Sequence, residues 1–144
     1  VKSGYGLTTE DELDTLRLYR DLGARHPVEL VPTFLGAHEL PPEFRKDGRT
    51  GRGRYLDLVC NDMLPAVAAE KLAAFCDVYC EEHVFSLKDA RRVLERGAKL
   101  GLRPKMHCDQ FHALGGVRLA AVTIPSVFIS STRRPISSGL TGSR

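Results

Sequence analysis

The stretch FCDVYCEEHVFSLKDARRVLERGAKLGLRPKMH, residues 75–107, predicts a strand, a helix and a second strand in direct succession. Residues 75–80 form a short, mostly apolar run that is typical of a buried strand. The helix begins at the capping box Ser86–Asp89 and ends at Gly101, and its buried stripe consists of Ala90, Val93, Leu94 and Ala98. Residues 103–107 form the second strand. Together these elements predict parallel strands joined by a crossover helix.

The residues that precede this unit show the same alternation. A first strand lies at the start of the chain, and a helix follows it from the capping box Thr9–Glu12 to Gly23. The apolar run 28–36 predicts the next strand, although Pro32 weakens that prediction because proline cannot donate a hydrogen bond to a neighbouring strand.

The middle of the chain holds a predicted loop and a predicted helix. Residues 39–54 are polar and rich in Pro, Gly and Arg, which favours a solvated loop. A helical pattern covers residues 56–74, and Pro65 within it predicts a kink or a helix start nearby. A short last helix is expected over residues 114–122.

Strands and helices that alternate in this way predict an α/β fold with a parallel sheet. The pattern fits either a small open sheet or half of an eight-stranded barrel, and it does not choose between them. The alternation stops near residue 122. We therefore expect two parts, an α/β segment over residues 1–121 and an irregular or divergent tail over 122–144, whose Ser, Thr, Arg and Pro content resembles out-of-frame translation.

Composition excludes several classes of protein. The 144 residues are 42% hydrophobic and 27% charged, as in ordinary globular domains, and no apolar run is long enough to span a bilayer. No signal peptide is visible, which favours a cytoplasmic location and reduced thiols at the four scattered cysteines. The basic residues are not gathered on one predicted face, so we expect no nucleic-acid partner and no membrane partner.

Polar side chains follow each predicted strand. Ligands of parallel α/β proteins bind at the carboxyl ends of the strands, so these residues would share one pocket mouth. They include Tyr5 after the first strand, His38 after the second, and His107 and Gln110 after the fourth. A neutral imidazole at His107 could ligate Zn²⁺ or Fe²⁺, but a catalytic zinc site needs about three protein ligands. His26, His83 and His112 are expected to be surface residues.

Several of these stretches resemble imidazolonepropionase, a family of the amidohydrolase superfamily, in the family's order and in one register from residue 1 to about 121. They are VKSGYGL (1–7), TFLGAH (33–38), LPPE (40–43), MHCDQ (106–110) and LGG (114–116). The resemblance covers an internal section of the family's chain. It implies a partial (β/α)8 TIM-type barrel of about four β/α units, continued by the irregular tail.

The resemblance also implies an activity and a set of site residues. The family uses one divalent metal ion, Zn or Fe, to hydrolyse the small molecule 4-imidazolone-5-propanoate to N-formimidoyl-L-glutamate in histidine degradation. By motif match, His107 is the metal ligand, Tyr5 and His38 bind the substrate, and Gln110 contacts the substrate or assists the attacking water. The full-length parent is expected to be a cytoplasmic homodimer.

The chain also departs from the family's pattern. The family's paired metal-binding His residues, its later metal-binding Asp and its Asp-His-Leu segment do not occur in this sequence. We therefore expect the isolated chain to be inactive. The alternative is a non-catalytic, truncated α/β half-barrel that acts as a binding or interaction module.

Overall fold

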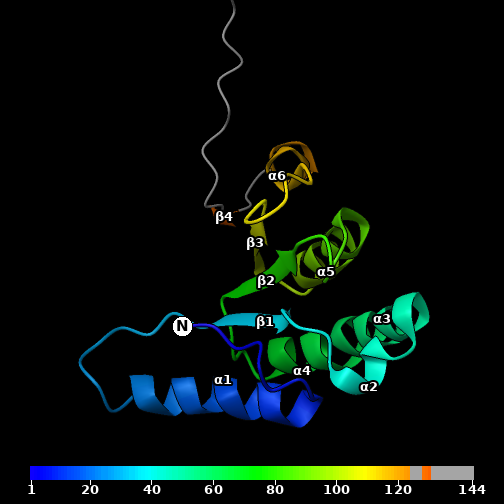
Figure 1. The fold of residues 1–144 in the computed structure, drawn as a ribbon. Coiled ribbons are helices and arrows are strands. Elements are labelled where there is room, and N and C mark those ends of the chain that lie inside the picture. Colours follow the sequence, from blue (N-terminus) through cyan, green and yellow to red (C-terminus); the bar gives the residue numbers. More distant parts are fainter. Residues whose placement is uncertain (124–127, 131–144) are drawn as a thin grey trace, which may run out of the picture.

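The computed structural model describes residues 1–123 and 128–130 and shows a mixed α/β fold (Figure 1). Its elements, in chain order, are α1 (Thr9–Gly23), β1 (Thr33–Ala37), α2 (Pro42–Arg45), α3 (Gly48–Leu58), the π-helical turn η1 (Val59–Met63), α4 (Leu64–Ala69), β2 (Phe75–Cys80), α5 (Leu87–Lys99), β3 (Arg103–Cys108), α6 (Gly116–Thr123) and β4 (Phe128–Ser130). The described strands form one parallel sheet in the order β1-β2-β3-β4. The predicted α/β class with parallel strands is thereby confirmed.

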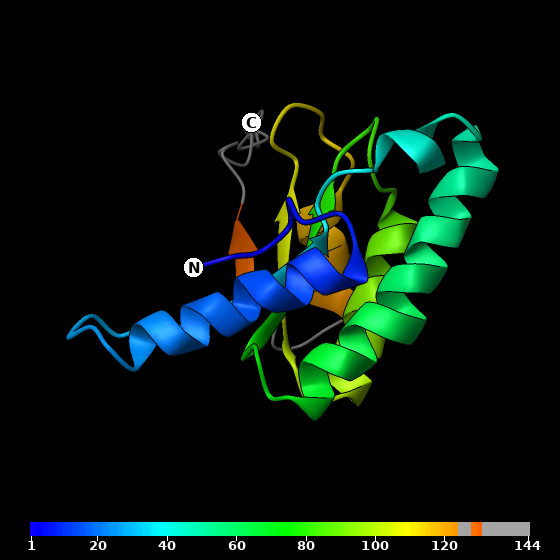
Figure 2. The same cartoon turned by 90° about the horizontal axis from the view of Figure 1, so that it is seen from below.

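The helices α4, α5 and α6 lie on the same side of the sheet (Figures 1 and 2). The strand side chains that face them are fully buried, and they are Cys76, Val78, Cys80, Met106 and Cys108. Packing is close enough that a Cβ atom on Gly97 of α5 would lie 2.8 Å from the Cβ of Cys76. Because strand side chains alternate between faces, the opposite face of β2 and β3 carries Asp77, Tyr79 and His107. His107 therefore points away from the helices, whereas its neighbours Met106 and Cys108 are buried against them.

The β2–α5–β3 unit matches its prediction, except that Gly97 rather than Ala98 completes the buried stripe of α5. Ser86 caps α5, because its hydroxyl oxygen accepts from the backbone N–H of Asp89 while the Asp89 carboxylate accepts from that of Ser86. The helix ends at Lys99, and Gly101 just beyond it has a φ of 86°. There the N–H groups of Gly101 and Leu102 donate to the last carbonyls of the helix. The capping box and the terminal glycine are thus confirmed.

The N-cap of the first helix lies one residue before the predicted one. Thr8, not Thr9, is the N-cap, and its hydroxyl oxygen accepts from the N–H of Asp11 at 3.1 Å. Glu12 is instead fully buried, and its carboxylate accepts from the N–H groups of Gly4 at 3.0 Å and Gly6 at 2.7 Å. Three consecutive acids made two capping registers possible. The buried Glu12 ties the loop that carries Tyr5 to α1.

The predicted strand over residues 28–36 is shorter than expected. Strand β1 begins only after Pro32, and Val28 and Val31 before it are exposed. The first predicted strand is reduced to a single parallel bridge between Lys2 and Thr33. Proline offers no N–H for pairing, which explains why regular pairing starts at Thr33.

The predicted loop over residues 39–54 is wrong, because most of it is helical. Helix α2 and the start of α3 occupy this stretch and pack against each other so closely that a Cβ atom on Gly51 would lie 1.8 Å from the carbonyl oxygen of Phe44. Glycine here permits helix contact. The sequence shows little apolar periodicity in this stretch, so the pattern did not reveal the helix.

The predicted helix over residues 56–74 begins inside a longer helical run from Gly48 to Ala69, and its last five predicted residues, 70–74, are not helical. The predicted disturbance near Pro65 is confirmed, since the turn before it is π-helical and the N–H of Leu64 bonds to the carbonyl of Val59. The last helix, α6, begins at Gly116 rather than at residue 114.

The predicted tail over 122–144 falls largely on residues 124–127 and 131–144, which lie outside the described residues. The short strand β4 lies within the predicted tail, at the described residues 128–130, and pairs with β3. In the described part of the chain, no helix has both the length and the apolar character required to cross a membrane.

All four cysteines are buried free thiols, as expected for small core residues. Burial raises the pKa of Cys80 to about 12 and that of Cys108 to about 11, and it raises the pKa of Cys76 still further. Burial raises the pKa of Cys60 as well, so all four thiols are favoured in their protonated form.

Candidate functional site

The sheet face opposite the helices carries a cluster of three ionisable side chains. His107 lies near the carboxyl end of β3, and Asp77 lies on the neighbouring strand β2. Lys2 reaches the cluster from the N-terminal segment that pairs with Thr33. A parallel sheet thus gathers residues that are 30 and 105 positions apart in the sequence.

Asp77 is the centre of this cluster. Its side chain is 1% exposed, and its Oδ2 accepts from Lys2 Nζ at 2.8 Å. His107 Nδ1 lies 3.1 Å from Asp77 Oδ1, and His107 Nε2 lies 2.9 Å from Lys2 Nζ. Burial alone would raise the pKa of Asp77, but the hydrogen bonds from His107 and Lys2 outweigh it and lower this pKa below its ordinary value. The carboxylate is therefore held ionised between two donors.

A row of aromatic rings continues from this cluster toward β1. Tyr79 is the register partner of His107 across β2 and β3, and its ring centroid lies 5.6 Å from that of His38. The ring of Tyr5 meets His38 edge-on at 4.7 Å. Burial lowers the pKa of His38 and the nearby His107 lowers it further, which favours a neutral imidazole. Tyr5 is 79% exposed, so its hydroxyl is open to a ligand.

The structure therefore brings together three of the four residues expected at the pocket mouth. Tyr5 and His38 are in contact, and Tyr79 links them to His107. Gln110 is half-buried in the loop that follows β3, three residues after His107. The functional roles assigned to these four residues remain predictions.

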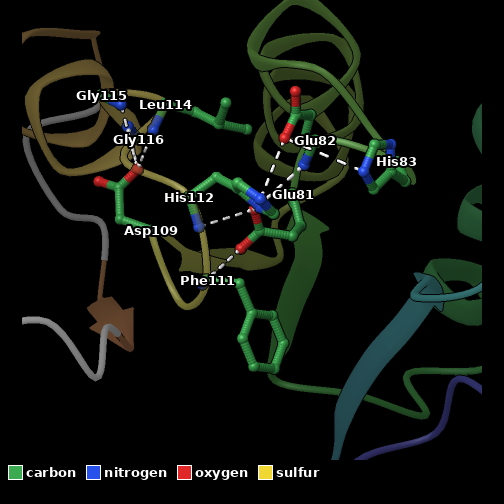
Figure 3. Close-up of polar contacts among 9 residues, drawn as sticks. All are labelled: Glu81, Glu82, His83, Asp109, Phe111, His112, Leu114, Gly115 and Gly116. Atoms are coloured by element: carbon green, nitrogen blue, oxygen red, sulfur yellow. Dashed lines mark hydrogen bonds and ion pairs between the residues drawn. The ribbon is translucent and has the colours of Figure 1, made fainter.

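A second polar cluster joins the loops that follow β2 and β3 (Figure 3). The buried carboxylate of Glu81 accepts from the backbone N–H groups of Phe111 at 2.9 Å and His112 at 3.1 Å, and it lies 2.9 Å from His112 Nδ1. Glu82 contacts the other ring nitrogen of His112 at 3.1 Å. Burial would raise the pKa of Glu81, but its hydrogen bonds, led by that from the Phe111 N–H, lower it. The expectation of surface residues is confirmed for His83 and His112, which are both exposed, and His112 also bridges both carboxylates.

Asp109 anchors the other end of the same loop. Its Oδ1 accepts from the backbone N–H groups of Leu114 at 2.8 Å, Gly115 at 3.0 Å and Gly116 at 3.2 Å, as Figure 3 shows. Its Oδ2 accepts from the N–H of Val117 at 3.2 Å. The loop that carries Gln110 is thus fixed to the start of α6 by Asp109 and to β2 by Glu81.

No protein-family model matches the chain. Among curated proteins, the imidazolonepropionase of Shewanella amazonensis is 52% identical over 121 residues, which is 84% of this chain and 29% of that protein. That of Symbiobacterium thermophilum is 53% identical over 122 residues, or 84% of this chain and 28% of that protein. That of Haloarcula marismortui is 49% identical over 121 residues, or 84% and 27%.

The chain is similar to imidazolonepropionase. The predicted resemblance is thereby confirmed. The chain spans less than a third of the length of the imidazolonepropionases that it matches, as expected for an internal section.

A metal ion of the kind expected for imidazolonepropionase would fit His107 as one ligand among several. The Asp77 carboxylate at Nδ1 is the arrangement that usually orients a metal-binding histidine. Within residues 1–123 and 128–130, however, no group of three or more His, Cys, Asp or Glu side chains could hold a metal. In the described part of the chain, His107 is thus oriented by a carboxylate but has no further candidate ligand beside it.

Sequence reasoning missed Lys2, Asp77 and Tyr79. A signal for Asp77 and Tyr79 was present, because strand alternation places them on the same face as His107, and a charged residue inside an otherwise apolar strand requires a partner. Lys2 carried no comparable signal, since its contact depends on the pairing of the N-terminal segment with β1.

Proposed function

We propose that residues 1–121 form a section of a metal-dependent cyclic-amide hydrolase of the imidazolonepropionase type. The whole enzyme would be a cytoplasmic (β/α)8 barrel that converts 4-imidazolone-5-propanoate to N-formimidoyl-L-glutamate in histidine degradation, and it would act as a homodimer. The observation that carries this proposal is the identity of about half of all residues to imidazolonepropionases over 121 residues. The sheet order supports it, since a β/α barrel requires sequential parallel strands.

The side chains of this section would supply binding and orientation. His107 would hold a Zn or Fe ion, which when bound polarises a carbonyl and makes hydroxide available near neutral pH. The exposed Tyr5 hydroxyl and the neutral His38 imidazole can hydrogen-bond the ring or the propanoate group of the substrate. The amide of Gln110 can orient the substrate or water, but it cannot accept a proton, so the general base must be another group.

A chimeric enzyme tests this function. We expect residues 1–121, placed in the Shewanella amazonensis imidazolonepropionase instead of the section they match, to give an enzyme that hydrolyses 4-imidazolone-5-propanoate at a rate comparable to that of the parent. Substrate loss can be followed by absorbance. A chimera that folds and binds metal as the parent does, yet shows no hydrolysis, would contradict the proposal.

The isolated chain should behave differently from the chimera. We propose that the 144-residue chain is inactive by itself, because a catalytic zinc needs about three protein ligands and the family resemblance assigns it only His107. No turnover is expected after addition of Zn²⁺ or Fe²⁺. Turnover by the purified chain would overturn this expectation, whereas specific capture of a partner by a folded but inactive chain would support the alternative of a binding module.

A further inference from the structure

We propose that Lys2 and Asp77 are positioning residues that together fix the neutral tautomer of His107, with the proton on Nδ1 and a lone pair on Nε2. The proposal rests on the function proposed above in one respect only. The Nε2 lone pair is the one that a divalent metal ion would use. The tautomer itself depends on contacts within this chain alone.

The two contacts of the His107 ring specify the same tautomer. A carboxylate can only accept hydrogen bonds, so the 3.1 Å contact between Asp77 Oδ1 and Nδ1 requires a proton on Nδ1. A lysine ammonium can only donate, so the 2.9 Å contact between Lys2 Nζ and Nε2 requires a lone pair on Nε2. With either contact alone, the other ring nitrogen would be restricted only by its hydrogen bonds to water. With both contacts, the ring has a single arrangement that satisfies both partners.

The partners of His107 are themselves held in place. Asp77 is buried in the middle of β2, and its Oδ1 also accepts from the backbone N–H of Val78 at 2.8 Å. The Lys2 backbone is fixed from both sides, since the Tyr19 hydroxyl donates to its carbonyl at 3.0 Å and the flanking residues Val1 and Ser3 bond to Thr33. Lys2 Nζ and Asp77 Oδ2 also pair directly at 2.8 Å. The pair is therefore a fixed frame against which the ring is oriented.

This arrangement explains why a lysine faces a proposed metal ligand. The Lys2 ammonium already directs a positive charge at Nε2, and it retains Asp77 as a partner if another cation takes its place at the ring. His107 would therefore not need to change its tautomer when a metal ion binds, which lowers the cost of reorganisation.

Nuclear magnetic resonance of the 144-residue chain labelled with ¹⁵N-histidine tests the proposal directly. Long-range ¹H–¹⁵N correlations report the tautomer of each histidine ring. They are recorded at a pH high enough that the ring chemical shifts no longer change with pH. We expect His107 to be in the Nδ1–H form in the unaltered chain. In Lys2→Met and in Asp77→Ala, the tautomer ratio should move by about tenfold toward the Nε2–H form, as expected for the loss of one charge-assisted hydrogen bond.

Matched controls separate positioning from general loss of structure. Asp14→Ala removes an exposed carboxylate paired with Arg17 and should leave the His107 tautomer unchanged. The backbone amide spectrum reports whether each variant folds, and if Asp77→Ala does not, the exposed Lys2→Met variant decides the outcome. A His107 ring in the Nε2–H form in the unaltered chain, or an unchanged ratio in both variants, would overturn the proposal. A change in one folded variant but not in the other would overturn the joint role of the two residues. Because the experiment contains neither metal nor substrate, an inactive chimera would defeat the proposed function and leave this result standing.

Discussion

The Asp109→Ala variant should lose about 3 kcal/mol of unfolding free energy, because one buried carboxylate satisfies four backbone N–H groups at the start of α6. Asp109 also has a φ of 52°, a conformation that aspartate and asparagine tolerate better than alanine. The substitution therefore removes the hydrogen bonds and also adds backbone strain at this φ. Urea unfolding followed by circular dichroism gives the change in free energy.

Two variants serve as controls for Asp109→Ala. Asp109→Asn keeps an acceptor oxygen and tolerates the same φ, so its loss should be about 1 kcal/mol. Asp14→Ala removes an exposed carboxylate and should change the free energy by no more than about 0.5 kcal/mol. If Asp109→Ala unfolded at the same urea concentration as the unaltered chain, the anchoring of the Gln110 loop by Asp109 would be refuted.

The His107→Ala variant of the chimeric enzyme should have no measurable hydrolase activity. The imidazole is the one metal ligand proposed for this section, and alanine offers no replacement. Metal content per protein, measured by atomic absorption, should fall together with activity. Asp77→Asn in the same chimera should still bind the metal ion. Its metal affinity or activity should be lower by about 10- to 100-fold, as is usual when the partner of a ligating histidine is altered.

The control for His107→Ala is His26→Ala, which alters an exposed histidine in the segment after α1 and should leave both activity and metal content unchanged. An active His107→Ala chimera would show that the metal is held without this residue, and the assignment of His107 would then fail.

Local signals were sufficient to predict the β2–α5–β3 unit. Its helix has an unambiguous capping box at Ser86 and an αL glycine at Gly101, and its strands are short apolar runs. The α2 and α3 region was missed because its stability depends on a tertiary contact, the approach of Gly51 to Phe44, rather than on an apolar stripe. The α1 cap was misplaced by one residue because the acids that follow Thr8 and Thr9 fit two registers.

The candidate site was predictable only in part. Strand ends and motif resemblance pointed to Tyr5, His38 and His107, and the structure brings these three to one row. The Lys2 and Asp77 partners of His107 could not be foreseen, because their contacts join segments up to 105 positions apart. Such contacts follow from strand register, which sequence periodicity alone does not determine.

Diffraction from the chimeric enzyme at the absorption edge of its metal would locate the ion relative to His107. We expect an anomalous peak about 2.0–2.1 Å from His107 Nε2, with Asp77 at Nδ1. A fully loaded, active chimera whose anomalous peak lies away from His107 would show that this section does not supply a metal ligand through that side chain.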